Sequence, residues 1–281
     1  MTIMFQWRVA LSTVRAFVLI SLAFLQTALA IRGQNLSGTN IAASGTSSAD
    51  ARAVLVELFT SEGCSSCPPA DALLQKMDAS SSAGGVQLIV LSEHVDYWDH
   101  DGWKDLHSSA ALTERQVSYV KSLGLTTPYT PQMIVDGTSE VHANNPAQLS
   151  KVLQDAASIP KIPVRIGEVN VAAGNPDVLQ AQIEADGYSD KRNADVYVAT
   201  MLDRVDSQVL HGENGGKHLA HVAVVLEIKK IGKLSKGKGF SEIVQLKLKP
   251  GTGSKNVRIV VFVQEPGLGK VLGAALRRSA D

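Results

Sequence analysis

The chain has 281 residues, and its 27 basic and 27 acidic side chains give a formal net charge of zero. This balance argues against a general affinity for nucleic acid or anionic membranes, since both depend on an excess of basic residues. A basic run at residues 229–238 contains glycines and a serine, which favours a solvated hairpin loop. We therefore expect no nucleic acid among the partners.

The first 51 residues have the pattern of an export signal followed by a tether. Arg8 and Arg15 precede an apolar stretch at residues 16–25, and Ala28 and Ala30 form a small-x-small cleavage signal. The stretch is shorter than the roughly 20 apolar residues of a membrane-spanning helix, so residues 1–30 are predicted to be a cleaved signal peptide. Residues 31–51 are rich in Ser, Thr, Gly and Ala, which is typical of a flexible tether. We expect a secreted or periplasmic protein without a stable membrane span after cleavage, an uncleaved anchor being the alternative.

Strand and helix patterns alternate over residues 52–159. Near-continuous apolar runs are typical of strands buried on both faces, and apolar residues at helical spacing predict helices. The dipeptide Asp136-Gly137 favours a tight hairpin turn. These patterns predict strands at residues 54–59, 86–91, 132–135 and 140–142, and helices that begin at Pro68 or Pro69, at Ser109 and at Pro146. We therefore expect an α/β domain at residues 52–159.

The pattern changes after Pro160 and Pro163, where helical spacing stops and alternating apolar and polar residues follow. Glycine, asparagine and aspartate separate the alternating segments, as in antiparallel β proteins. The predicted strands cover residues 164–171, 178–185, 194–202, 219–228, 243–248 and 257–263. We expect a second, smaller, sandwich-like all-β domain at residues 160–281.

Cys64 and Cys67 are the only cysteines of the chain, and they follow the first predicted strand as a Cys-x-x-Cys turn that leads into a helix. A helix N-terminus stabilises a thiolate on the leading cysteine. A disulfide across so short a segment contributes well below the roughly 3 kcal/mol estimated for a 15-residue loop, so stapling is a weak explanation. Structural zinc needs four ligands, and the chain has no second cysteine pair. The motif favours redox chemistry.

A polar, aromatic segment at residues 92–105 follows the second predicted strand. It holds two of the three tryptophans and the histidines His94 and His100. Ligands of open α/β sheets bind beside the strand C-termini, so we expect His94 and Asp96 to lie near Cys64. There, His94 would either move protons during thiol exchange or join both sulfurs in a copper site; alternatively, the segment only packs on the core. Two interpretations of the three histidines at residues 211–221 stay open: metal ligands, or polar residues of a Gly-rich loop that joins two strands.

The element order, with Cys-x-x-Cys opening the first helix, resembles the thioredoxin fold. That resemblance implies a cis-proline beside the disulfide, just before the third strand, and Thr130-Pro131 stands at that place. Gly63 replaces the tryptophan that thioredoxin has before its first cysteine, and Ser65-Ser66 replaces Gly-Pro. These differences leave the redox potential open, because potentials across this fold span about 150 mV.

Four segments together resemble a family of exported, thioredoxin-like bacterial proteins of unknown function: residues 56–71 around CSSCPP, 94–99, 115–116 and 129–132. The resemblance continues through residues 212–214 and the last predicted strand. We expect a thiol-disulfide oxidoreductase that acts on protein thiols or disulfides, with Cys64 as nucleophile, Cys67 as resolving thiol and Thr130-Pro131 presenting backbone to the partner chain. The alternatives are a copper-binding or chaperone-like protein that uses Cys64, Cys67 and His94, and a non-catalytic interaction module.

Overall fold

The computed structural model describes residues 52–80, 86–187 and 193–279. The predicted signal peptide and tether lie outside these residues. No helix in the described ranges is long and apolar enough to cross a membrane. The elements in chain order are β1 (Arg52–Thr60), α1 (Pro68–Ala79), β2 (Val86–His94), α2 (Ala110–Ser122), β3 (Gln132–Val135), β4 (Ser139–Val141), α3 (Pro146–Ser158), β5 (Val164–Ile166), β6 (Asn170–Val171), β7 (Val178–Ala185), β8 (Ala194–Gln208), β9 (His218–Leu234), β10 (Phe240–Lys247), a 3-10 turn (Ser254–Asn256), β11 (Val257–Gln264) and β12 (Val271–Arg278).

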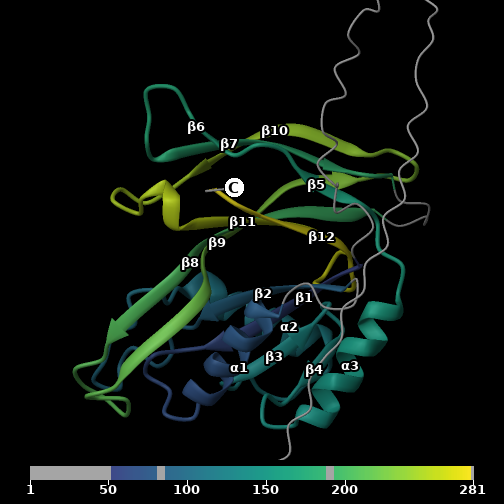
Figure 1. The fold of residues 1–281 in the computed structure, drawn as a ribbon. Helices are drawn as coiled ribbons and strands as arrows, with labels where there is room; N and C mark the ends of the chain where they lie inside the picture. Colours follow the sequence, from purple (N-terminus) through teal and green to yellow (C-terminus); the bar gives the residue numbers. More distant parts are fainter. Residues whose placement is uncertain (1–51, 81–85, 188–192, 280–281) are drawn as a thin grey trace, which may run out of the picture. The chain divides into compact units, whose positions relative to one another are not determined.

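The larger sheet has eight strands in the order β12-β11-β8-β9-β2-β1-β3-β4. β1 and β2 are parallel, whereas β3 is antiparallel to β1 and β4 is antiparallel to β3. The two parts of the sheet meet where β9 runs parallel to β2 at the pair Ser92 and Val224. Four strands beyond the expected boundary at residue 160 thus belong to the same sheet as β1–β4 (Figure 1). That boundary marks a change of sequence pattern within one compact unit, Thr46–Asp281.

The helices begin where the sequence predicts. Ser109 caps α2 by accepting the backbone N–H of Leu112 at 3.3 Å, and Asn145 caps α3 through Gln148 at 3.1 Å. Both are the residue types that satisfy exposed amides at a helix start. Asp136 and Gly137 turn the β3–β4 hairpin with φ angles of 48° and 72°, the left-handed conformation that this dipeptide tolerates.

A smaller sheet, β10-β7-β5 with β6 paired to β7, packs on β8, β11 and β12. Their shared core contains Leu179 and Ile183 from β7, and Val196 and Ile259 from the larger sheet. The opposite side chains of the larger sheet, with Leu74 of α1 and Leu149 of α3, form a separate core. Burial of apolar surface on both faces is what fixes the register of these strands.

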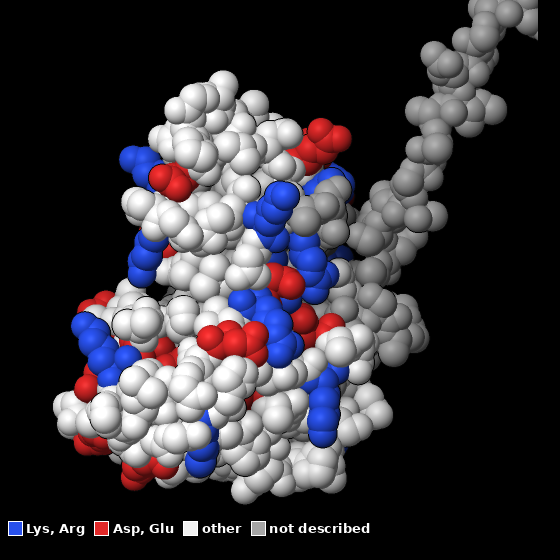
Figure 2. All heavy atoms as spheres, turned by 60° about the vertical axis from the view of Figure 1, so that its left-hand side comes forward, with Lys and Arg blue, Asp and Glu red and all other residues white. Residues whose placement is uncertain are grey.

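Basic and acidic side chains are interspersed over the face shown in Figure 2, with neutral areas between them. The basic run expected to be a loop begins instead within β9, which extends to Leu234. Lys230 in that strand pairs with Asp195 of β8 at 2.6 Å. Residues 229–234 of the basic run therefore belong to β9, and the loop between β9 and β10 consists only of residues 235–239.

Candidate functional site: the covered disulfide

Cys64 and Cys67 form a disulfide in the turn between β1 and α1. Cys67 is the N-cap residue of α1, and Pro68 starts the helix, where the missing proline N–H removes no hydrogen bond. The backbone N–H of Cys67 donates to the carbonyl of Cys64 at 3.2 Å. Both cysteines are 0% exposed, while Ser65 and Ser66 between them are exposed. The two cysteines are thus joined as a disulfide and enclosed, so a partner has no access to their sulfurs in this form.

The loop at residues 209–217 between β8 and β9, which we call the cover loop, binds the backbone of the disulfide turn. Asn214 in this loop is fully buried. Its side-chain amide donates to the carbonyls of Glu62 at 2.8 Å and Cys64 at 2.9 Å. Glu213 accepts the backbone N–H of Ser65 at 3.2 Å. In Figure 1 the green β8–β9 hairpin reaches down to the level of α1, where this contact is made.

Trp98 links the disulfide turn to the cis-proline. A Cβ atom added to Gly63 would lie 3.0 Å from Cβ of Trp98 and 3.2 Å from its carbonyl oxygen, so any other residue there requires a small shift of Trp98. The indole N–H of Trp98 donates to Oγ1 of Thr130 at 2.8 Å. The Thr130–Pro131 bond is cis, as the resemblance to thioredoxin implies. Close approach of Trp98 gives a physical reason for Gly63 at this position.

His94 lies at the end of β2 and is fully buried. Its Nδ1 is 2.6 Å from Oδ2 of Asp105. Burial alone would lower the pKa of His94, but the charge and hydrogen bond of Asp105 raise it. Asp105 also accepts the backbone N–H of Glu62 at 2.9 Å. The segment after β2 is therefore anchored to the residue two positions before Cys64.

The other polar residues of this segment have different places. Asp96, predicted to lie near Cys64, accepts the hydroxyl of Thr113 on α2 at 2.6 Å, so its carboxylate binds α2. His100 is largely exposed beside Asp101. Trp103 donates its indole N–H to Glu62 Oε2 at 2.7 Å, a contact that joins the segment to the disulfide turn.

His221 of β9 completes the buried group next to the disulfide. Its ring centroid is 4.8 Å from that of His94. Its Nε2 is 3.9 Å from Glu62 Oε1 and its Nδ1 is 3.8 Å from Asp71 Oδ2, too far for hydrogen bonds. The sequence places His211, His218 and His221 together, but only His221 is buried. His221 lies beside His94 because β9 pairs with β2, and the sequence pattern does not reveal this pairing.

Several polar atoms of this group face each other without pairing. Glu62 Oε1, Asp71 Oδ2, His94 Nε2 and both ring nitrogens of His221 have no hydrogen-bond partner within the described ranges. Burial raises the pKa of Asp71 to about 7 and lowers the pKa of His221 to about 3. The group therefore holds a carboxyl that is partly protonated near neutral pH, beside a neutral imidazole.

The copper alternative does not gain support from this arrangement. Among the residues that the structure describes, no group of three or more His, Cys, Asp or Glu side chains is arranged to hold a metal ion. Cys64, Cys67 and His94 are thus not assembled as a metal site in the disulfide form. His94 instead uses Nδ1 to bind Asp105.

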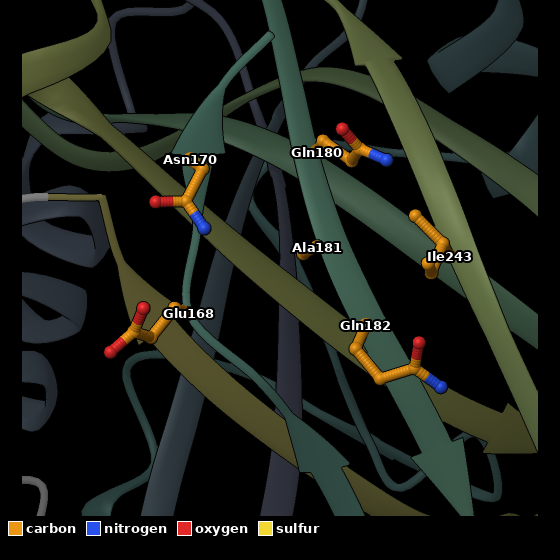
Figure 3. Close-up of a pocket in the computed structure, with 6 residues that line it drawn as sticks. All are labelled: Glu168, Asn170, Gln180, Ala181, Gln182 and Ile243. Atoms are coloured by element: carbon orange, nitrogen blue, oxygen red, sulfur yellow. The ribbon is translucent and has the colours of Figure 1, made fainter.

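A pocket lies away from these residues on the smaller sheet (Figure 3). Gln180 and Gln182 of β7 line it, with Ile243 of β10 across the strand pair and Glu168 and Asn170 before and in β6. None of its lining residues is a cysteine or a histidine. It therefore offers no thiol or imidazole chemistry.

One family model and one solved structure match most of this chain. A solved structure of protein AGR_C_4864 from Agrobacterium tumefaciens is 28% identical, with a TM-score of 0.63, and the match covers 80% of this chain and 94% of that one. A domain of the outer membrane lipoprotein Omp28 from Porphyromonas gingivalis is 14% identical with a TM-score of 0.27, over 43% of this chain and 88% of that one, a likeness too low to carry an argument. No curated protein matches the chain. The family model described as "Protein of unknown function (DUF1223)" matches residues 55–264, and the chain therefore belongs to that family.

Proposed function

We propose that this protein is a thiol-disulfide oxidoreductase, exported to the periplasm or cell exterior, that acts on protein thiols or disulfides. The observation that carries the proposal is the Cys64–Cys67 disulfide at the start of α1. Thiolates are stabilised at helix N-termini, where unpaired amides and the helix dipole favour negative charge. Thr130–Pro131, joined to the same turn through Trp98, would lie beside a bound partner chain.

We further propose that β1–β4 and α1–α3 form a thioredoxin-like unit within the larger sheet. The strand order β2-β1-β3-β4, with only β3 and β4 antiparallel to their neighbours, supports this assignment. So does the position of the disulfide between β1 and α1. The strands β8, β9, β11 and β12 would then be an extension of that sheet which also covers the disulfide.

The proposed reaction exchanges one disulfide for another. The Cys64 thiolate of the reduced protein attacks a substrate disulfide, forms a mixed disulfide and releases one substrate thiolate. The Cys67 thiolate then attacks the Cys64 sulfur, closes the Cys64–Cys67 disulfide and releases the second thiolate. Two electrons pass from the protein dithiol to the substrate, and the released thiolates take up the two protons of the cysteines. The reverse sequence oxidises a substrate dithiol.

The test is to trap the mixed disulfide. Cys67→Ala removes the resolving thiol, so a partner captured by Cys64 should remain attached and appear as a higher-mass species that a reductant removes. Cys64→Ala and the double variant are the matched controls and should trap nothing through this route. Equal trapping by all variants, or none by Cys67→Ala in extracts of the source cells, contradicts the proposal.

A further inference from the structure

Asn214 of the cover loop is fully buried and binds the backbone of the disulfide turn. Asn214 Nδ2 donates to the carbonyls of Glu62 and Cys64, which flank Gly63. Its Oδ1 accepts from Nζ of Lys217 at 2.8 Å. One amide therefore satisfies two backbone acceptors of the disulfide turn, and buried carbonyls that lose such a donor are destabilised.

The cover loop is built to keep its shape around Asn214. The backbone N–H groups of Gly215 and Lys217 donate to the carbonyls of Gly212 and Asn214, both at 3.0 Å. Gly212 has a φ of 74°, and a Cβ atom there would lie 2.9 Å from the carbonyl oxygen of Asp101. The loop is thus a compact, internally bonded unit that packs between the segment after β2 and the disulfide turn.

β9, which follows the cover loop, carries unpaired buried polar atoms near its first residues. His221 has no hydrogen bond at either ring nitrogen, and Glu62 Oε1 and Asp71 Oδ2 beside it are also unpaired within the described residues. Water would hydrate these atoms if the hairpin moved away. Their hydration offsets part of the cost of breaking the Asn214 contacts, since unsatisfied buried polar atoms destabilise the closed state.

We propose that Asn214 is a positioning residue of the Cys64–Cys67 turn and that the cover loop gates access to the disulfide. This inference rests on the proposed function, because it adds regulation to the same cysteine pair. In the closed state both sulfurs are 0% exposed, and Asn214 holds the Cys64 carbonyl in the position that it has in the disulfide form. Opening of the loop precedes attack on the disulfide, and reduction of the disulfide loosens the turn that Asn214 binds.

A loop that must open before the disulfide is attacked has a kinetic consequence. No such consequence is expected if Asn214 only stabilises the fold. If opening precedes attack, the rate of reduction by dithiothreitol levels off at high dithiothreitol, because opening becomes limiting. Asn214→Ala removes both donated hydrogen bonds, and Asn214→Asp places a carboxylate against two carbonyl oxygens. Both variants should raise the limiting rate at least tenfold.

Equilibrium with glutathione gives a second readout. Because Asn214 binds the turn in its disulfide form, Asn214→Ala should shift the equilibrium toward the dithiol. A tenfold shift corresponds to about 30 mV in reduction potential. The matched control is Asn175→Ala, which removes an exposed asparagine from the turn before β7 and should leave both rate and potential unchanged.

Far-UV circular dichroism before reduction verifies that each variant is folded. Gly212→Ala, whose methyl group would press on Asp101, replaces any variant that fails this check and should also accelerate reduction. Limiting rates of the Asn214 variants within twofold of wild type, or a wild-type rate that stays proportional to dithiothreitol, overturn the gate. Partner trapping by Cys67→Ala is independent of these rates. If Cys67→Ala traps a partner but the Asn214 variants do not change the reduction rate, only the gate is overturned. If the Asn214 variants accelerate reduction but Cys67→Ala traps no partner, only the oxidoreductase proposal is overturned.

Discussion

Two buried polar groups lie on the larger sheet, and they differ in how their charges are balanced. In the first, Arg115 of α2 donates to Glu57 of β1 at 2.7 Å and lies over the rings of Tyr119, Tyr197 and Phe262. Glu93 beside them has no hydrogen bond within the described residues but lies 3.7 Å from the Arg115 guanidinium. In the second, beside the disulfide, Glu62, Asp71 and His221 face one another without hydrogen bonds between them. A paired group fastens elements together, whereas an unpaired one leaves charge and proton position free to change. We therefore expect the Arg115 group to contribute mainly to stability and the His221 group to make stability depend on pH.

The largest expected effect comes from removing the cation of the first group. Arg115→Ala leaves Glu57 buried with a hydroxyl donor, Tyr119, but no positive charge, and Glu93 beside it also loses its charge partner. Breaking a buried ion pair in this way costs roughly 3–5 kcal/mol. Urea unfolding measures the loss, with Arg165→Ala, from an exposed ion pair, as the control. If the free energy of unfolding falls by less than about 1 kcal/mol, as is typical of exposed ion pairs, this group contributes little to stability.

Asp71 of the second group should make stability depend on pH. Burial raises its pKa from 3.8 to about 7, so the folded state binds the proton more tightly than the unfolded chain. This contribution favours folding below pH 3.8 and is lost as the pH rises through that value to about 7, by at most roughly 4 kcal/mol at about 1.4 kcal/mol per pKa unit.

Asp71→Asn removes this titration and isolates it from other groups. The variant should gain stability relative to wild type between pH 4 and pH 8, as measured by urea unfolding at both values. Asp155→Asn, which changes an exposed aspartate on α3, is the matched control and should leave the difference between the two pH values as in wild type. An unchanged difference between wild type and Asp71→Asn at the two pH values contradicts the raised pKa.

The His94–Asp105 pair is a local test of the same group. Asp105→Asn removes the negative charge that raises the pKa of His94, so burial then prevails and that pKa should fall below 6.5. NMR titration of the His94 ring reports the shift directly, and His100, which is largely exposed, serves as an internal reference. A His94 titration that is the same in both proteins would show that Asp105 does not set its charge.

The smallest effect is expected at Trp98. Trp98→Phe keeps an aromatic ring and the Cβ atom that lies near Gly63 but removes the hydrogen bond to Thr130. A net loss of about 1 kcal/mol in the free energy of unfolding is typical of one neutral hydrogen bond. Because the ring remains, the limiting rate of disulfide reduction should stay near wild type; a large acceleration would make Trp98 part of the gate.

The sequence is most informative where local patterns decide the structure. The apolar run of β1, the prolines at the start of α1 and the Asp136-Gly137 turn each carry their own signal, and the structure has these elements in place. β12 is different. Its sequence VLGAALRR is rich in Ala, Leu and Arg, which favour helices, and only pairing with β11 makes it a strand.

The site shows the same division. Cys64 and Cys67 are identified by spacing alone, and His94 by its place at the end of a strand. Asn214 and His221 are polar residues near a Gly-rich turn, with no local signal of burial. They reach the disulfide because β9 joins β2 in the sheet, a pairing between distant segments that depends on tertiary packing. Contacts that set access to the site therefore come from the part of the chain that looks most like a separate β domain.

The central claim is that Cys64–Cys67 is a redox-active pair rather than a structural crosslink. The direct measurement is to equilibrate the folded protein with glutathione buffers and to count free thiols while monitoring the fold by circular dichroism. A redox-active pair should show a two-electron transition to two thiols, with a midpoint between about −270 and −120 mV, in a protein that stays folded. Thiols that appear only below about −300 mV, the range of structural disulfides, or only together with unfolding would contradict it.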